Sequence, residues 1–143
     1  MSVMRIARRP PVTISVGATV ADGIRTMRDR RAGVLLVTDG GRLMGTFTER
    51  DVRERVVLGK RDPETTSIHE VMTAPVWTIG PDQTVDDALG LMLEHRIRHL
   101  PVVEDGRVEG VVSLRYMLRD KAEGLVARLD SLSAYLSADG IGG

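Results

Sequence analysis

The chain has 143 residues, of which 42% are hydrophobic and 28% charged, a composition typical of a globular protein. Twenty basic side chains balance twenty acidic ones and only 3% of residues are aromatic, which argues against nucleic acid as a partner. The absence of cysteine excludes disulfides. No apolar run reaches the roughly 20 residues that a membrane span needs, and none follows the N-terminus as it would in a signal peptide. We therefore expect a cytoplasmic protein that does not enter a membrane.

The sequence repeats itself at an offset of 65 positions, so that Thr19 matches Thr84 and Gly45 matches Gly110. A chance match would not keep one register through strands, helices and turns, so the chain contains a duplication. The predicted units are repeat 1 at residues 10–60, a linker with a short helix at 61–74, repeat 2 at 75–120 and an amphipathic C-terminal helix at 121–139.

Repeat 1 begins with a predicted helix behind Thr19. This residue is a typical N-cap, Asp22 three positions later suggests a capping box, and apolar residues recur behind them at helical spacing. The runs 34–38 and 42–47 are predicted strands, because Asp-Gly between two apolar runs is a strong hairpin signal. A second helix is expected to begin at Thr48.

The linker and repeat 2 follow the same logic. Residues 59–66 are polar, and 67–72 are predicted to form a short capped helix. Thr84 and Asp87 then start the first helix of repeat 2. The remaining elements of this repeat are strands at 100–104 and 107–112 and a helix that begins at Ser113. Because a unit of 50 to 60 residues alone covers its sheet poorly, we expect the two sheets to pack together.

Each first helix also contains a glycine, Gly23 in repeat 1 and Gly90 in repeat 2. A glycine costs a helix about 1 kcal/mol relative to alanine. We therefore expect these small residues to permit close approach of a neighbouring strand or ligand.

Beyond Arg119 a third helical stretch carries leucines at positions 125, 129, 132 and 136. Spacings of three and four place them on one face. The stretch lies outside the repeat, so we expect it to dock on the rest of the module or on a partner. Residues 140–143 are predicted to be disordered.

The duplicated unit resembles the cystathionine-β-synthase (CBS) domain family over roughly residues 10–120. The segments that carry the resemblance are Thr-Val-x-Asp at 19–22 and 84–87, Gly-Thr-Phe-Thr-Glu-Arg-Asp at 45–51, Glu-Val-Met-Thr at 70–73, Arg-His-Leu-Pro-Val-Val at 98–103 and Gly-Val-Val-Ser at 110–113. The resemblance implies an α/β fold of two β-α-β-β-α repeats packed as a pseudo-two-fold pair, plus the C-terminal helix. It further implies a stand-alone, non-catalytic sensor module that forms a homodimer, binds AMP, ADP or ATP in a cleft between the repeats and requires no cofactor.

The first predicted cleft centres on Thr48 and Asp51. They lie where a strand ends and a helix begins, a place that attracts phosphate, and a carboxylate can accept both hydroxyls of a ribose. The same pattern is also an ordinary capping box, and both roles can coexist. Arg50 is either a phosphate ligand or a solvated side chain. By resemblance, the base end of this cleft is lined by Thr46, Ile97, Arg98 and His99.

The second cleft departs from the family pattern. Ser113 keeps the hydroxyl, but Tyr116 occupies the position of the ribose-binding acid. A phenol cannot accept two hydroxyls as a carboxylate does, so we predict a weak or empty site. Its other candidate residues are Gly33, Val34, Val111 and Arg115. Arg98 and His99 are alternative phosphate ligands for this second cleft.

The three histidines, His69, His95 and His99, do not suggest a metal site. Without cysteine a zinc ion would need carboxylate ligands, and His95 and His99 straddle a helix-to-strand junction rather than share one helical face. No spacing supports a nucleophile with its base, so we expect no enzymatic activity. The alternative function is a dimerisation or interaction module with vestigial clefts, which binds an unidentified effector protein.

Overall fold

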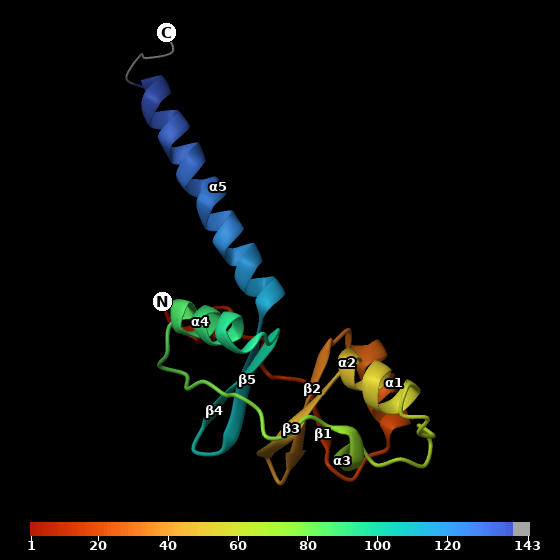
Figure 1. The fold of residues 1–143 in the computed structure, drawn as a ribbon. Helices are drawn as coiled ribbons and strands as arrows, with labels where there is room; N and C mark the ends of the chain where they lie inside the picture. The colour runs from red at the N-terminus through yellow and green to blue at the C-terminus, as the bar shows by residue number, and fades with distance from the viewer. Residues whose placement is uncertain (139–143) are drawn as a thin grey trace.

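Five strands form one sheet in the order β1-β2-β3-β5-β4 in the computed structural model, which describes residues 1–138 (Figure 1). The strands are β1 (Thr13–Ser15), β2 (Val34–Asp39), β3 (Arg42–Thr48), β4 (His99–Glu104) and β5 (Arg107–Ser113). The helical segments are η1 (Val3–Arg5), α1 (Val20–Arg30), α2 (Glu49–Asp51), η2 (Val52–Val57), α3 (Ile68–Val71), α4 (Val85–His95) and α5 (Leu114–Ala138). This mixed α/β architecture confirms the predicted fold class. The observed hairpin strands agree with the predicted ones to within one residue at each end, and the first helices begin directly after Thr19 and Thr84 as predicted.

The two hairpins show that the duplication extends to hydrogen-bond register. Strands β2 and β3 pair antiparallel with an irregularity between Val37 and Thr38, and β4 and β5 pair with an irregularity between Val102 and Val103. These positions differ by 65, the offset of the repeat. The hairpins meet through Arg42 and Arg107, at the ends nearest their turns. The two halves therefore form a continuous sheet joined at a narrow contact.

The first strand of the repeat is the place where the two copies differ. In repeat 1, β1 pairs with β2 over three residues, and the N–H of Leu36 bonds the carbonyl of Val12 at 2.9 Å. In repeat 2 only Ile79 and Val102 form a bridge. Pro101 stands at the position that matches Leu36 and has no N–H to donate. The predicted strand of repeat 2 is reduced to a bridge for this reason.

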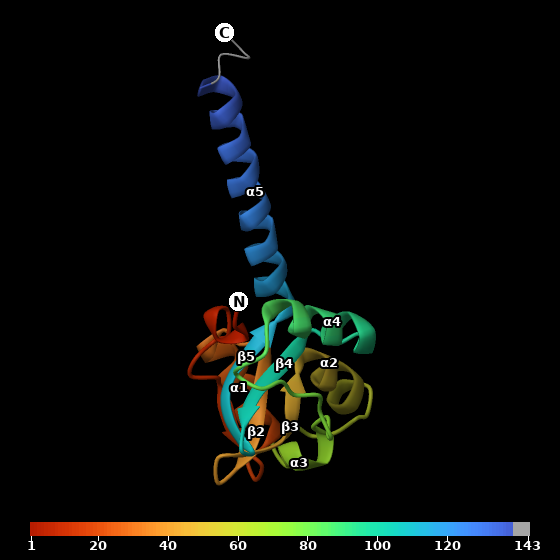
Figure 2. The same cartoon turned by 90° about the vertical axis from the view of Figure 1, so that its left-hand side faces the viewer.

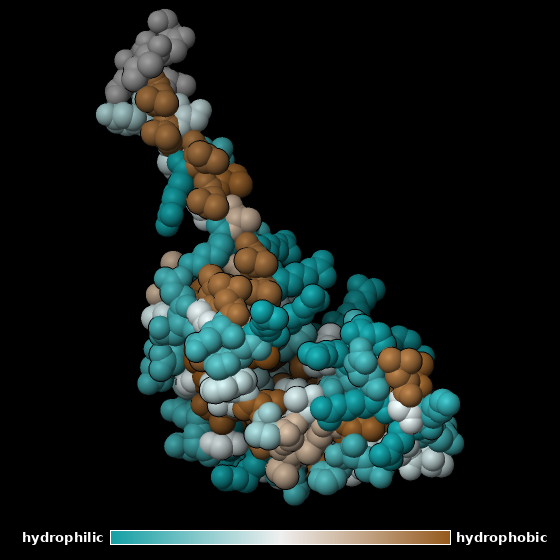
Figure 3. Space-filling view, in the orientation of Figure 1, coloured by the Kyte–Doolittle hydropathy of each residue, from teal (hydrophilic) through white to brown (hydrophobic). Residues whose placement is uncertain are grey.

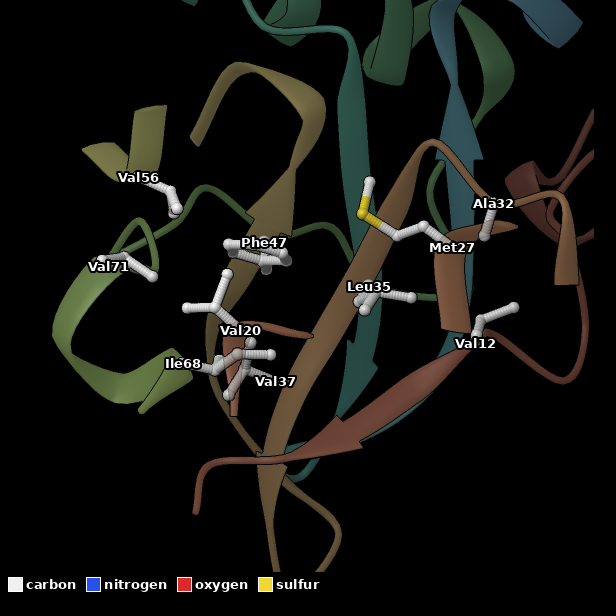
Figure 4. Close-up of a cluster of buried hydrophobic side chains, with 10 residues drawn as sticks. All are labelled: Val12, Val20, Met27, Ala32, Leu35, Val37, Phe47, Val56, Ile68 and Val71. Carbon is white, nitrogen blue, oxygen red and sulfur yellow. The ribbon is translucent and has the colours of Figure 1, made fainter. Parts of the chain in front are cut away.

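Each repeat has its own apolar core, and a third cluster joins them. Figure 4 shows the repeat 1 core, in which Leu35 of β2 and Phe47 of β3 pack with Val20 of α1. Because side chains alternate along a strand, Val34 and Leu36 point to the other face of β2, where they pack with Val111 of β5. Strand β2 is thus buried on both faces, and the two repeats pack together as predicted, although their strands belong to one continuous sheet.

The segment that precedes each repeat packs against the other repeat, so the two leading segments are exchanged. Val3 is fully buried in the core of repeat 2, whereas Ile68 and Val71 are buried in the core of repeat 1. Isolated bridges join Arg8 to Val111 and Thr73 to Thr46. Each segment then continues through a cis peptide bond, at Pro10 or Pro75, into its own repeat. Neither exchange was predicted.

Gly23 has the role that the sequence analysis expected, and Gly90 does not. A Cβ atom at Gly23 would lie 2.7 Å from Cδ1 of Ile68 and 3.2 Å from the ring of Phe47. A Cβ atom at Gly90 would meet no atom within 4 Å. Only the glycine of repeat 1 is required by packing.

The second helix differs between the repeats. After Thr48 the chain forms three α-helical residues and then a π-helical segment that ends at Val57, followed by Gly59 and Pro63. The matching glycine, Gly124, lies inside α5, which continues to Ala138. Proline cannot continue a helix, whereas residues 125–136 are mostly good helix formers. The predicted C-terminal helix is present up to residue 138, but it continues the helix of repeat 2 and does not form a separate element. Asp139 and the predicted disorder at 140–143 lie outside the described residues.

Helix α5 projects from the body and contacts it only near its first turns (Figures 1 and 2). Arg5 donates two hydrogen bonds to the Asp120 carboxylate, at 2.9 and 2.7 Å, and Lys121 forms an ion pair with Asp86 at the start of α4. These contacts tie the helix to the N-terminal segment and to α4. The leucines beyond them are exposed, so of the two alternatives expected for this stripe, docking on the module is wrong and docking on a partner stays a prediction.

Candidate functional site

The acidic side chain at the start of α2 is almost completely buried. Asp51 is 3% exposed, and its Oδ2 accepts hydrogen bonds from the N–H of Thr48 at 2.9 Å and from the hydroxyl of the same residue at 3.2 Å. The N–H of Asp51 in turn donates to the Thr48 hydroxyl at 3.4 Å. The capping box is therefore formed, as one of the two sequence interpretations expected.

The other oxygen of Asp51 faces the segment that leads into repeat 2. Oδ1 accepts a hydrogen bond from the Thr73 hydroxyl at 2.8 Å, and Nε of Arg55 lies 3.7 Å from it. Arg55 also donates to the carbonyl of Met72 at 2.7 Å. One carboxylate thus holds two hydroxyls from two different segments, with a guanidinium beside it that partly balances its charge.

The other predicted residues of repeat 1 lie on either side of this acid. Thr46 is buried, and its backbone pairs with that of Thr73 at 2.9 and 2.8 Å. A Cβ atom at the neighbouring Gly45 would lie 2.6 Å from the Thr73 carbonyl oxygen, so glycine is needed for this approach. Arg50 is exposed to solvent. Strand β3, α2 and the Thr73 segment therefore meet at Asp51.

The repeat 2 residues predicted for the same cleft differ in their burial. The side chain of Ile97 packs against the core of repeat 2, and Arg98 is exposed. His99 is half-buried, and its ring lies 3.7 Å from the position that a Cβ atom would take at Gly33. The fold therefore brings His99 beside Gly33, a residue of the second predicted cleft, for which His99 was the alternative phosphate ligand.

Electrostatics around His99 favour its neutral form. Burial lowers the pKa of this imidazole below its ordinary value, Arg98 lowers the pKa further, and Glu49 opposes both effects. The buried Nδ1 atom has no hydrogen-bond partner among the described residues. A buried polar atom without a partner is uncommon and is compatible with a ligand that would supply one.

The second predicted cleft lacks a comparable acid. The Ser113 hydroxyl accepts a hydrogen bond from the N–H of Tyr116 at 3.2 Å, and Tyr116 is about half exposed, at 48%. Val34 and Val111 pack against each other in the cluster that joins the repeats, and Arg115 is exposed. The hydroxyl cap is conserved between the two copies of the repeat, but the buried carboxylate exists in repeat 1 alone.

Two residues of the Asp51 site were absent from the sequence prediction. Thr73 ends the Glu-Val-Met-Thr segment that carried part of the family resemblance, and this position was the available signal. Arg55 lies four residues after Asp51, a spacing that places two helical side chains on one face. Its contact with Met72 depends on the path of the linker, which the sequence did not reveal.

Two surface cavities lie away from these residues. A groove of about 660 Å³ runs between the start of α4 and the base of α5, and a second of about 500 Å³ lies beside α4. Asp86 contributes to both. None of the predicted nucleotide-binding side chains lines either cavity.

No helix in residues 1–138 combines the length and the apolar character that crossing a bilayer would require.

The CBS domain family model matches the chain twice, at residues 3–58 and 68–123. Both matches begin earlier in each copy than the predicted repeats, and they include the segments that are exchanged between the cores.

Individual relatives agree with this match. The CBS domain-containing protein CBSCBSPB2 of Arabidopsis thaliana is 32% identical over 138 residues, which is 96% of this chain and 26% of that protein. The chain therefore spans about a quarter of this relative. The CBS domain-containing protein YhcV of Bacillus subtilis is 32% identical over 102 residues, covering 71% of this chain and 72% of YhcV.

A solved structure supports the same assignment. A protein with CBS domains from Burkholderia ambifaria MC40-6 superposes with a TM-score of 0.77 at 36% identity, covering 84% of this chain and 93% of that one. A tandem CBS pair of this kind is a regulatory module. The family model matches both repeats, and the repeats share one hydrogen-bond register and exchange their leading segments. The chain therefore belongs to the CBS domain family, as a tandem CBS pair.

Proposed function

We propose that this CBS pair is a non-catalytic, cytoplasmic sensor that binds AMP, ADP or ATP through one competent site, centred on Asp51 of repeat 1. The observation that carries the proposal is the pair of hydroxyls on the Asp51 carboxylate. Thr48 and Thr73 occupy its two oxygens at 3.2 and 2.8 Å. A ribose diol offers the same two donors, so a nucleotide can replace these contacts without leaving the buried carboxylate unsatisfied.

The site also explains how binding would reach both repeats. Thr48 belongs to repeat 1, whereas Thr73 lies on the segment that enters repeat 2 through the cis bond before Pro75. A ligand that displaces Thr73 from Asp51 changes the link between the repeats. Binding then biases their relative arrangement by its difference in affinity for the two arrangements.

The test compares two acids that have the same capping role. Asp87 forms a capping box with Thr84 at the start of α4 but is exposed and lies outside the predicted site. We expect AMP, ADP or ATP to raise the melting temperature of the wild-type chain and of Asp87→Ala, and to have no effect on Asp51→Ala. A 2′,3′-dideoxy analogue of the active nucleotide should also have no effect, because it lacks the diol.

Restoring the acid in repeat 2 provides the reciprocal experiment. Tyr116→Asp should add a second binding event, visible as a doubled stoichiometry in calorimetry, because Ser113 already supplies the hydroxyl. Two binding events of similar affinity in the wild-type chain would contradict the asymmetry. An equal loss of binding in Asp51→Ala and Asp87→Ala would show that capping, rather than ligand contact, is the role of Asp51.

The alternative function is a module for dimerisation or for docking on an effector protein, with clefts that bind no ligand. The exposed leucine stripe of α5 favours this reading. A thermal-shift panel of AMP, ADP, ATP, NADH and S-adenosylmethionine separates the two functions. No shift from any of these compounds would favour the interaction module.

A further inference from the structure

Helix α5 carries an unbroken apolar seam along one side of its projecting part. The seam alternates in steps of four and three and consists of Leu118, Ala122, Leu125, Leu129, Leu132 and Leu136. All six residues are exposed, with the exposed fraction of the leucines between 39% and 65%. This is the a/d pattern of a coiled coil over nearly three heptads, in which another helix would cover the seam.

The projecting part of α5 has no support from the module. Figure 3 shows apolar surface continuing from the body along the helix to the end of its described part. Short isolated helices are marginal in water, and most helical stability in proteins comes from packing an apolar face. The seam therefore has the residue pattern of a coiled-coil helix, and packing a second helix against it would stabilise α5.

We propose that α5 packs antiparallel against α5 of a second copy of this chain, forming a two-stranded coiled coil with a module at each end. The inference goes beyond nucleotide binding and does not depend on it. A seam that pairs with itself makes an isologous interface, the kind found in two-fold dimers. A second copy is the one partner whose seam is certain to match in length and spacing.

The antiparallel arrangement matches every layer of the seam. Two residues face each other when their numbers add to 254, which pairs a position of one type with a position of the other. The pairs are Leu118 with Leu136, Ala122 with Leu132 and Leu125 with Leu129. Leucine faces leucine in every layer except the two that pair Ala122 with Leu132, and no seam residue is left over.

The body of the module opposes the parallel arrangement. Figures 1 and 2 show the body lying directly below the first turns of α5. Packed helices lie 8–10 Å apart, whereas a body of about 110 residues has a radius of gyration of roughly 13 Å. Two bodies at the same end of such a pair would collide. Antiparallel helices place them at opposite ends.

The residues beside the seam give the arrangement a charge signature. In this register the Val126 residues of the two copies lie within one turn of each other along one edge of the seam, and the two Arg128 residues do so along the opposite edge. The exposed arginines can extend their stems over the leucines and keep their charges in water. The like charges nevertheless weaken pairing, so a mixture of wild type and Arg128→Glu should form heterodimers in preference to either homodimer.

The first test measures the molecular mass of the full chain in solution by light scattering. We expect a dimer for the wild type and a monomer for the double variant Leu125→Glu/Leu129→Glu. Ala127→Glu/Ala134→Glu places the same charges on the opposite, exposed face of the helix and should remain a dimer. A monomeric wild type, or a dimer that survives the leucine substitutions, would overturn the proposal.

The second test decides the orientation and uses the absence of native cysteine. Leu118→Cys and Leu136→Cys are 18 residues apart, roughly 27 Å along the helix. In the antiparallel pair each variant alone should fail to form a disulfide-linked dimer, whereas an equimolar mixture of the two should form one. A disulfide-linked dimer from either variant alone would show parallel helices and contradict the antiparallel arrangement. Circular dichroism of each variant verifies that the module stays folded.

Discussion

His99 lies between the repeats, and its buried Nδ1 atom has no hydrogen-bond partner in the described part of the chain. The groups around it are the Arg98 guanidinium, which disfavours a positive imidazole, the Glu49 carboxylate, which favours it, and the backbone at Gly33, which carries no charge. Burial is the largest influence, so the pKa of His99 lies below its ordinary value. The native state therefore prefers the neutral ring.

This preference makes the stability of the fold depend on pH. Above a pH of about 6.5 the imidazole is neutral in both the folded and the unfolded chain. As the pH falls below that value the unfolded chain takes up the proton first, so the free energy of unfolding decreases until the folded state also protonates. The loss is about 1.4 kcal/mol for each unit by which the pKa is lowered.

Urea unfolding of His99→Gln at pH 7.5 and pH 5.5 tests this prediction. The variant should lose less stability on acidification than the wild type, because glutamine does not titrate. His69→Gln, which changes an exposed histidine, is the control and should behave as the wild type does. Equal pH dependence of wild type and His99→Gln would contradict a lowered pKa.

At the scale of elements, helix α1 packs more closely than its counterpart α4. Gly23 lies against Ile68 of α3 and Phe47 of β3, and both of these side chains are fully buried. Gly90 faces open space on α4. The same residue type is therefore a packing requirement in one repeat and an avoidable cost in the other.

Two alanine substitutions should change the free energy of unfolding in opposite directions. Gly90→Ala is expected to raise the free energy of unfolding by up to about 1 kcal/mol, from helix propensity alone. Gly23→Ala gains the same propensity but forces Ile68 and Phe47 to move within a closely packed core, so we expect a net destabilisation of roughly 1 kcal/mol. Chemical denaturation measures both. Stabilisation by both substitutions would show that the Ile68 side chain relaxes freely.

At the scale of the molecule, the exchanged segments make each repeat depend on chain from outside it. Val3 is fully buried among repeat 2 residues, and Arg8 donates to the carbonyls of Arg30 and Arg31 at the end of α1 in repeat 1. The first nine residues thus contact both halves. Loss of their packing should weaken repeat 2, although they precede repeat 1 in the sequence.

Val3→Ala tests this coupling. Removing two buried carbon atoms should cost about 2 kcal/mol, and hydrogen exchange should rise first in β4 and β5 of repeat 2. Val57→Ala removes the same atoms from an exposed side chain and should change stability by less than about 0.5 kcal/mol. Faster exchange confined to β1 and β2 would contradict the assignment of Val3 to the core of repeat 2.

The sequence alone determined the duplication, the hairpins and the N-caps, because each rests on residues close together in the chain. Thr84 with Asp87 and the Asp105-Gly106 turn are local signals of this kind. The asymmetry at Asp51 and Tyr116 was also visible, since it needs only the alignment of the two copies. The continuity of α5 was misjudged because Arg119 marks the end of the repeat but is no helix breaker.

Only the tertiary structure decided which segments meet across the repeats. The contact of Thr73 with Asp51 and the neighbouring positions of His99 and Gly33 join residues far apart in sequence. No local propensity encodes such pairs, because they follow from packing one repeat on the other and from the exchange of the leading segments. The apolar seam of α5 illustrates the difference. The spacing of its leucines was evident in the sequence. That the module leaves these leucines exposed was not evident, because exposure depends on where the rest of the chain packs.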